Sequence, residues 1–341
     1  MIKLRGIVAF ALLIAVLANV IGFQGTPTLI MTTMLGLALL CVFFLLDKPL
    51  WFAVPLGAVL ILAKLEPPQP GEQVLYTGRG FFGVNRVVDG PNGAQRRLYH
   101  GTTVHGIQNT DPERKELHLE PMTYYHRTGP LGMIFESAQA KKKFKRVGVI
   151  GLGAGTAAAY ILPEQKFVFF EIDPIVKQIA ENPKYFTFLK ECSGEYEIIL
   201  GDGRLKLAAE DDTSFDLLVL DAFSSDAIPI HLMTREAIEM YASKLAPDGL
   251  MAFHISNLHF DLEPILGDIA AELGLESITW HDRNITEEEM IEGKAPASYV
   301  VITRDLNRTG LGKGLKWKKT SRSGRKRVWT DKFSNLFDAM K

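Results

Sequence analysis

Residues 147–156 read Val-Gly-Val-Ile-Gly-Leu-Gly-Ala-Gly-Thr, a short apolar run that leads into three glycines. The run is typical of a buried strand, and we expect a helix to begin directly after the last glycine. Glycines let the backbone turn sharply and let a ligand approach the free N–H groups of that helix. The loop therefore predicts a nucleoside site at Gly151, Gly153 and Gly155, with tight packing alone as the alternative.

Further β-rich runs follow this one and are separated from each other by helical stretches. They span residues 167–171, 197–200, 215–220 and 250–255. Alternation of strands and helices is typical of a parallel sheet covered on both faces. The stretch before it, residues 74–108, is rich in glycine and β-forming residues and predicts a small antiparallel β-unit.

Acidic residues follow the strands of the predicted parallel sheet, at the edge where ligands bind. Glu171 lies 20 residues after Gly151, where a carboxylate can accept both ribose hydroxyls. Asp202, in Gly201-Asp202-Gly203, can accept a hydrogen bond from an adenine amino group. Together with the glycine loop, Glu171, Asp202 and Gly203 outline a nucleoside pocket.

Asp221 comes directly after the fourth strand of this predicted sheet. A carboxylate there can accept a proton or orient a cationic amine, and the alternative is a turn or helix cap. His231 and His254 are expected to line the acceptor side of the same space. The segment 124–126, Tyr-Tyr-His, is expected either to shape the pocket or to pack. We expect no metal site, because His100 and His105 lack a recognised spacing with other ligands.

The charge of the chain is unevenly distributed. The 341 residues include 38 Lys plus Arg and 39 Asp plus Glu, for a net charge of -1, yet residues 6–46 contain no charged side chain. Residues 1–65 carry +3, residues 66–303 carry -13 and residues 304–341 carry +9. A mildly acidic globular part disfavours nucleic acid as a partner, because neutralising phosphates needs a basic surface. Two cysteines, Cys41 and Cys192, cannot form a disulfide framework.

The N-terminal region contains apolar runs of the length that a membrane-spanning helix needs. Residues 6–23 and 28–46 are candidate spans, residues 49–63 are a shorter third run, and a cleaved signal peptide is the alternative for the first. Residues 1–65 are therefore expected to be a transmembrane anchor of two or three helices. A Pro-rich linker at 66–73 then marks a domain boundary.

The C-terminal segment, residues 304–341, is strongly basic. Two interpretations stay open, a solvated terminal segment and a surface that touches anionic lipid headgroups. Trp317 and Trp329, among the basic residues, favour the lipid interpretation.

The chain resembles the spermidine synthase (polyamine aminopropyltransferase) family, most closely its bacterial membrane-bound branch. The resemblance covers roughly residues 78–303 and the closing residues 328–331. It rests on the order of an Asp89-Gly90 turn, Tyr99-His100, the glycine loop, Glu171-x-Asp173, Gly201-Asp202-Gly203 and Asp221.

The resemblance implies an α/β fold: a small β domain at residues 74–140 and a class I methyltransferase-like Rossmann domain at 141–303. It implies aminopropyl transfer from decarboxylated S-adenosylmethionine to a diamine or other amine, in polyamine biosynthesis. Glu171 would bind the ribose and Asp202 the adenine, while Asp221 would deprotonate the attacking amine with help from Tyr99. Ser224, Asp226 and His254 would contact the amine substrate.

Three positions depart from the family pattern: Ala154 and Ser224 replace aspartates, and Gly101 replaces a glutamate. They weaken the expected contacts to a dicationic amine. The alternatives are an S-adenosylmethionine-dependent methyltransferase and a non-catalytic membrane sensor that retains the nucleoside pocket.

The expected partners are a small-molecule amine and the lipid bilayer, with a homodimer as a further expectation. Because the donor is made in the cytosol, we expect a multi-pass protein of the bacterial inner membrane whose catalytic domain faces the cytoplasm.

Overall fold

The computed structural model describes residues 71–136, 144–223, 229–257, 259–311, 316–324 and 328–341. The chain divides into two units, residues 1–69 and 70–341, and every described residue belongs to the second unit. The predicted transmembrane anchor, residues 1–65, lies outside the described residues, as does most of the predicted linker. Within the described ranges no helix combines the length and apolar character needed to cross a bilayer.

Residues 73–109 form a four-stranded antiparallel sheet, in agreement with the predicted β-unit. The strands lie in chain order, and they are β1 (Gln73–Gly80), β2 (Gly83–Asp89), β3 (Gln95–His100) and β4 (Thr103–Asn109). A short 3-10 helix, Pro91–Gly93, connects β2 to β3, so the predicted Asp89-Gly90 turn is part of a longer connection.

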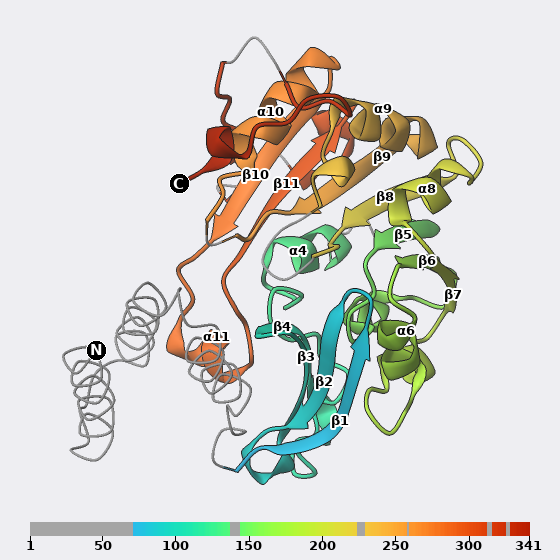
Figure 1. The fold of residues 1–341 in the computed structure, drawn as a ribbon, viewed down its shortest axis with the longest axis vertical. Helices are drawn as coiled ribbons and strands as arrows, with labels where there is room; N and C mark the ends of the chain where they lie inside the picture. The colour runs from blue at the N-terminus through green and yellow to red at the C-terminus, as the bar shows by residue number, and fades with distance from the viewer. Residues whose placement is uncertain (1–70, 137–143, 224–228, 258, 312–315, 325–327) are drawn as a thin grey trace, which may run out of the picture. The chain divides into compact units, whose positions relative to one another are not determined.

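The second sheet has eight strands in the order β12-β10-β11-β9-β8-β5-β6-β7. All of them except β12 are labelled in Figure 1. Five of them, which pair in parallel, correspond to the runs that the sequence predicted: β5 (Arg146–Ile150), β6 (Lys166–Glu171), β7 (Glu195–Leu200), β8 (Phe215–Leu220) and β9 (Leu245–His254). Their spatial order is that of a doubly wound sheet, with the switch point between β5 and β8. The predicted α/β, Rossmann-like fold is confirmed.

Three strands extend this sheet beyond the five predicted ones. They are β10 (Glu276–Asp282), β11 (Ala297–Thr303) and β12 (Lys318–Lys319). β11 lies antiparallel between β9 and β10, and β12 pairs antiparallel with β10. The sheet is therefore mixed, whereas the sequence pattern had predicted a parallel sheet.

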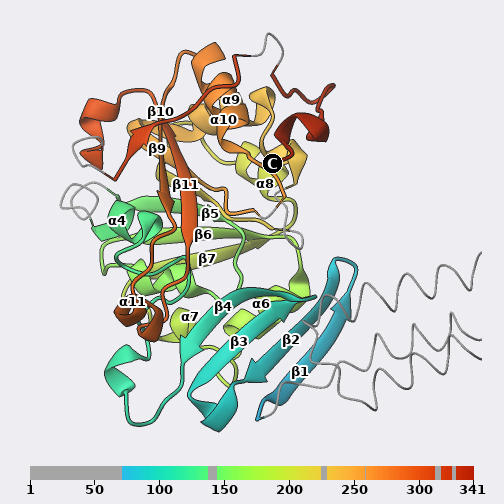
Figure 2. The same cartoon turned by 90° about the vertical axis from the view of Figure 1, so that its left-hand side faces the viewer.

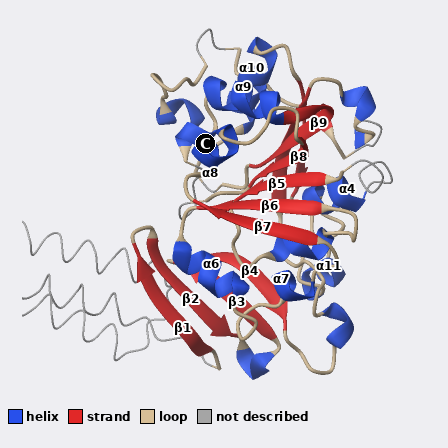
Figure 3. Cartoon of the chain, turned by 90° about the vertical axis from the view of Figure 1, so that its right-hand side faces the viewer, coloured by secondary structure: helices blue, strands red, loops and turns tan. Residues whose placement is uncertain are grey.

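Side chains alternate between the two faces of the large sheet and build a core on each. Val147 and Val149 point to one core, while Ile150 points to the other. The second core is covered by α8 (Gly203–Ala208), α9 (Arg235–Lys244) and α10 (Glu263–Glu272), and Figure 3 shows these helices on one side of the sheet. The first is covered by α4 (Pro130–Glu136), α6 (Pro174–Glu181), α7 (Phe188–Glu191) and the 3-10 helix Thr156–Tyr160.

The small sheet lies against α6 (Figure 2). Val87 and Leu98 of the sheet form one buried cluster with Ala154 of the glycine loop and Ile179 of α6. Across the same contact, Nδ2 of Asn85 donates a hydrogen bond of 2.8 Å to Oδ2 of Asp173, the residue that caps α6. These contacts bring β2 and β3 to the rim of the large sheet, where the predicted site lies.

The remaining described elements are short. They are the helix α11 (Glu287–Ile291) and the 3-10 helices Lys115–Leu117, Ile230–Leu232, Leu306–Arg308 and Leu336–Ala339.

The C-terminal tryptophans are buried inside the domain. Trp317 is 9% exposed and packs edge-on against Trp280, and Trp329 is 2% exposed in the core under α9 and α10. Both side chains are thus used in packing, and they give no support to the lipid interpretation of the basic segment.

Candidate active site

A cavity of about 530 Å³ lies where the carboxyl ends of the parallel strands face the small sheet. Its size lies within the range of roughly 300–1,000 Å³ that is usual for small-molecule sites. Four carboxylates line it, Glu171, Asp173, Asp202 and Asp221, and the described lining residues include no lysine or arginine. The cavity therefore favours a cationic ligand.

The glycine loop forms the floor of the cavity, and two of its glycines are required by geometry. Gly151 has a φ of +104°, and a Cβ there would lie 2.4 Å from the backbone oxygen of Asp221. Gly153 has a φ of +55°, and a Cβ there would lie 2.7 Å from the backbone oxygen of His105. Gly155 does not line the cavity but begins the following 3-10 helix, which replaces the α-helix expected there. The loop fits closely between β8 and β4.

Ala154 faces away from the cavity. It is 1% exposed, and its Cβ lies 2.5 Å from the position that a Cβ on Gly106 would occupy. The glycine loop and β4 are thus in direct contact at this point. A carboxylate at position 154, as in the family pattern, would be buried against this strand.

Glu171 lies at the end of β6 with only 7% of its surface exposed. Its Oε2 accepts a 2.9 Å hydrogen bond from the backbone N–H of Leu152, and Oε1 accepts one of 2.8 Å from Asp173. Burial raises the pKa of the Glu171 carboxyl, and the backbone donors partly offset that effect. The carboxylate thus ties the glycine loop to β6 while lining the cavity.

Asp202 and Gly203 line the cavity at the start of α8. Oδ1 of Asp202 caps this helix by accepting from the backbone N–H of Leu205 at 2.9 Å, and Oδ2 lies 3.0 Å from Nε2 of His231. His231 also lines the cavity. Each carboxylate oxygen can accept a second hydrogen bond, so Asp202 retains capacity for a ligand.

Asp221 follows β8 directly, and its side chain is only 3% exposed. The hydroxyl of Tyr125 donates a hydrogen bond to Oδ2, and Nδ1 of His254 lies 2.6 Å from Oδ1. Burial and the charge of Asp221 raise the pKa of Tyr125 well above its usual value of 10. Tyr125 therefore keeps its proton and acts as a donor, which leaves Asp221 as the group that can accept one.

The structure does not bring Tyr99 to Asp221. Leu98 and His100 line the cavity, so Tyr99 between them points to the opposite face of β3, where Arg86 lies over its ring at 5.7 Å. Tyr125 occupies the place beside Asp221 that the sequence had assigned to Tyr99.

His254 also differs from its predicted placement. It is 4% exposed and does not belong to the residues that line the cavity, because Asp221 stands between it and the open space. Ser224 and Asp226, the other two predicted amine contacts, lie outside the described residues.

The C-terminal segment supplies residues that sequence reasoning did not assign to the site. Trp329 and Leu336 line the cavity. Two hydrogen bonds of 2.7 Å from Arg204 to Asp331 hold this segment against α8. A tryptophan within a basic stretch carries no local signal of such a role, because its contacts are all distant in sequence.

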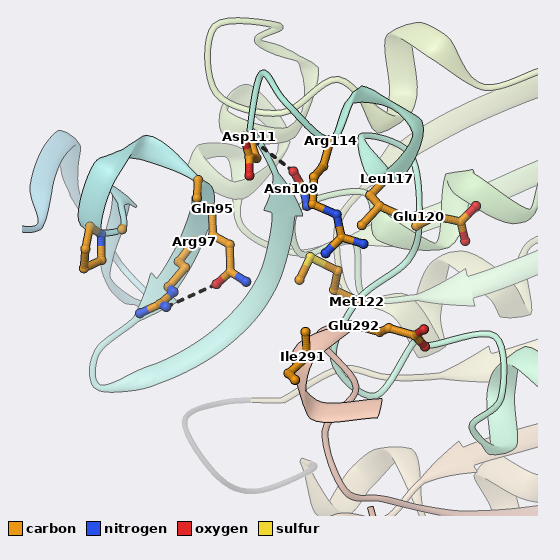
Figure 4. Close-up of a pocket in the computed structure, with 13 residues that line it drawn as sticks. Gln95, Arg97, Asn109, Asp111, Arg114, Leu117, Glu120, Met122, Ile291 and Glu292 are labelled. Carbon is orange, nitrogen blue, oxygen red and sulfur yellow. Dashed lines mark hydrogen bonds between the residues drawn. The ribbon is translucent and has the colours of Figure 1, made fainter. Parts of the chain in front are cut away.

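A second, smaller cavity of about 250 Å³ lies between the small sheet and α11 (Figure 4). Arg97 and Arg114 share it with Glu120 and Glu292, and Leu117, Met122 and Ile291 supply its apolar part. It contains none of the predicted site residues. Among the residues that are described, no three His, Cys, Asp or Glu side chains gather as a metal site would require.

Comparisons with known proteins point to aminopropyltransferases. No protein-family model matches the chain. A polyamine aminopropyltransferase of Vibrio vulnificus (strain CMCP6) is 34% identical over 156 residues, which cover 44% of this chain and 48% of that protein. A probable polyamine aminopropyl transferase of Bifidobacterium longum (strain NCC 2705) is 27% identical over 182 residues, 50% of this chain and 39% of the relative. The chain thus spans about half or less of the length of these curated relatives.

The fold also has a counterpart among solved structures. A probable spermidine synthase from Corynebacterium glutamicum ATCC 13032 aligns with a TM-score of 0.50 and 15% identity, over 77% of this chain and 99% of that chain. This likeness supports the Rossmann-like α/β fold. The curated relatives support the resemblance to the polyamine aminopropyltransferase family.

Proposed function

We propose that this protein transfers an aminopropyl group from decarboxylated S-adenosylmethionine to an amine. The observation that carries the proposal is the placement of Asp221: a buried carboxylate, held by the Tyr125 hydroxyl, at the same cavity as the glycine loop and Glu171. A proton acceptor beside a nucleoside pocket is what amine alkylation by a sulfonium requires.

The nucleoside of the donor would occupy the side formed by the glycine loop, Glu171 and Asp202. Gly151 and Gly153 line the floor, Glu171 would accept the ribose hydroxyls, and Asp202 would accept the adenine amino group. The four carboxylates of the cavity would attract the positively charged sulfonium. No metal is needed for this role.

In the reaction, the neutral nitrogen of the acceptor attacks the aminopropyl carbon next to the sulfonium. A C–N bond forms, the C–S bond breaks with its electron pair remaining on sulfur, and methylthioadenosine leaves. Asp221 accepts the proton that the acceptor's ammonium must lose before its nitrogen can attack. Two of its four lone-pair positions face Tyr125 and His254, so two remain for the amine.

The test uses the full chain with decarboxylated S-adenosylmethionine and a panel of amines that includes putrescine. Mass spectrometry should detect methylthioadenosine together with the aminopropylated amine. Asp221→Asn should abolish both, whereas Asp211→Asn, an exposed aspartate after α8, should not. Adenosylhomocysteine formed from S-adenosylmethionine would instead establish the methyltransferase alternative, and ligand binding without any product would favour the sensor.

We also propose that residues 1–65 anchor the protein in the bacterial inner membrane with residues 74–303 in the cytoplasm. Apolar runs 6–23 and 28–46 support the anchor, and the cytosolic origin of the donor supports the orientation. The protein should stay with membranes after alkaline carbonate washing. A C-terminal tag should be digested by protease added to inverted vesicles, and protection of the tag would contradict this orientation.

A further inference from the structure

His254 lies behind Asp221 and connects it to the strand β11. Its Nδ1 is 2.6 Å from Oδ1 of Asp221, and its Nε2 is 2.8 Å from Oγ of Ser256. We infer that His254 is a positioning residue, a neutral Nδ1–H donor that Ser256 holds in this tautomer so that Asp221 presents its free lone pairs to the acceptor amine. The inference rests on the proposed function for the identity of that amine.

The hydrogen bonds of Ser256 decide which ring nitrogen carries the proton. The backbone N–H of Ser298 donates to Oγ of Ser256 at 2.9 Å, so this oxygen already accepts one hydrogen bond. Ser256 retains one hydroxyl hydrogen, and Nε2 of His254 is in reach to accept it. With Nε2 as an acceptor, the ring proton is on Nδ1 and faces Asp221.

A doubly protonated ring would satisfy fewer of these groups. Oγ of Ser256 has two lone pairs and could accept from Nε2–H as well as from the backbone N–H of Ser298, but the hydroxyl hydrogen would then lose Nε2 as its acceptor. The neutral ring satisfies every one of these groups.

Aromatic side chains fix the plane of the ring. Tyr124 and Tyr299 stack on its two sides with ring centroids at 4.3 and 4.8 Å, and Phe223 meets it edge-on at 4.9 Å. Since the side chain of His254 is 5% exposed, it can rotate little without disturbing these contacts. The donor therefore points at Oδ1 of Asp221 before any substrate arrives.

The order Asp221, His254, Ser256 matches the contacts of a nucleophilic triad, but Ser256 is not placed to attack a ligand. It does not line the cavity, and its oxygen accepts the Ser298 N–H. Ser256 serves here as the anchor of the imidazole.

Asp221 thus receives a hydrogen bond on each oxygen, from Tyr125 on one and from His254 on the other. Two donors, one on each oxygen, fix the plane of the carboxylate. This gives His254 a role in the rate of the chemical step and little role in binding the amine.

The kinetic test compares His254→Asn with His254→Leu in the full chain. The two replacements are of similar size and both remove the stacked ring, but the Asn amide can donate from the position of Nδ1 and Leu cannot. We expect Leu to lower kcat at least about tenfold with KM changed less than about twofold, and Asn to recover most of that loss. Equal losses in kcat for the two variants would overturn the inference.

The second measurement needs no turnover. ¹⁵N spectra of the histidine-labelled protein, assigned by the signal missing in His254→Asn, should show a neutral His254 ring with its proton on Nδ1 at pH 7. Ser256→Ala should shift the ring toward the Nε2–H tautomer. An Nε2–H or doubly protonated ring in the unaltered protein would overturn the inference, whereas a protein that forms no product would overturn only the proposed function.

Discussion

Tyr125 donates a hydrogen bond to Oδ2 of Asp221 although 96 positions separate the two residues in the chain. Tyr125→Phe removes this donor and keeps the ring that contacts Tyr124 at 4.8 Å. A hydrogen bond to a charged group contributes about 1.5–3 kcal/mol, so kcat should fall roughly 10- to 100-fold.

The matched control is Tyr241→Phe. The hydroxyl of Tyr241 is also buried but has no hydrogen-bond partner among the described residues. Its removal should leave kcat unchanged. Steady-state product formation by mass spectrometry measures both variants, and a Tyr125→Phe protein as fast as the unaltered one would exclude a role for this hydroxyl.

Glu171→Gln should weaken nucleoside binding at least about tenfold, because the ribose hydroxyls lose a charged hydrogen-bond acceptor. The pH dependence follows from the raised pKa of Glu171. As the pH falls, this group takes up its proton earlier than an exposed glutamate, so affinity should decline at a higher pH than its ordinary pKa of 4.5 implies. The variant should lack this decline.

Calorimetric titration with methylthioadenosine across a pH series measures both effects. Glu181→Gln is the control, since Glu181 lies on α6 and pairs only with Lys177 among its described contacts. An affinity that Glu171→Gln leaves intact would remove Glu171 from the ribose contact.

Gly151→Ala should destabilise the domain more than Gly274→Ala. Both glycines have a positive φ, but a Cβ at Gly151 would press on the backbone of Asp221, whereas nothing lies within 4 Å of one at Gly274. The difference in the free energy of unfolding, from urea titration, therefore isolates the close approach. We expect this difference to be about 1–3 kcal/mol. An equal loss of unfolding free energy in the two variants would mean that the glycine loop can shift to make room for the added Cβ.

The lowered pKa of Glu263 predicts that the protein loses stability in acid. Burial alone would raise the pKa of its carboxyl, but hydrogen bonds from His281 and from the backbone N–H of Ser321 outweigh it and lower the pKa to about 2. Because the pKa of Glu263 is lower in the folded state, its contribution to the free energy of unfolding is complete above pH 4.5. This contribution is lost as the pH falls from there to about 2.

Acid titration followed by circular dichroism should therefore show a shallower loss of stability for Glu263→Gln between these two pH values. Glu164→Gln, at an exposed site, should titrate like the unaltered protein. Identical curves for Glu263→Gln and the unaltered protein would show that this carboxylate contributes nothing in acid.

The two buried tryptophans near the C-terminus should behave differently. Each Trp→Ala replacement should cost about 3–5 kcal/mol of stability. Only Trp329 lines the cavity, so Trp329→Ala should also weaken methylthioadenosine binding, whereas Trp317→Ala should not. Thermal unfolding with and without the nucleoside separates the effects, and a ligand-induced shift in Tm that survives in Trp329→Ala would contradict this assignment.

Local sequence patterns were sufficient for the parallel part of the sheet. The predicted runs at 147–150, 167–171 and 215–220 agree with β5, β6 and β8 to within one residue at each end. Short apolar segments bounded by glycine or acidic residues are strong local signals. The antiparallel strand β11 was missed although all seven of its residues are buried, because its place between β9 and β10 depends on pairing across the chain.

The candidate site was predictable where it follows the strands and not where it depends on tertiary contacts. Glu171, Asp202 and Asp221 line the cavity as expected, since each lies at the end of a strand or just after it. Tyr99 was assigned to this place from the family resemblance, whereas Tyr125 was expected only to shape the pocket or to pack. The alternation of side chains in β3 turns Tyr99 away from the cavity.

Trp329 forms part of the cavity wall, and this has a consequence for the order in which parts of the domain fold. Synthesis proceeds from the N-terminus, so β5, β6 and β7 leave the ribosome well before residue 329 does. A nascent chain can then present the glycine loop and its acidic neighbours while the wall of the pocket is still missing. Nucleoside bound with the help of Trp329 would stabilise only chains in which the segment that contains Trp329 has docked, which couples ligand occupancy to the folding of that segment.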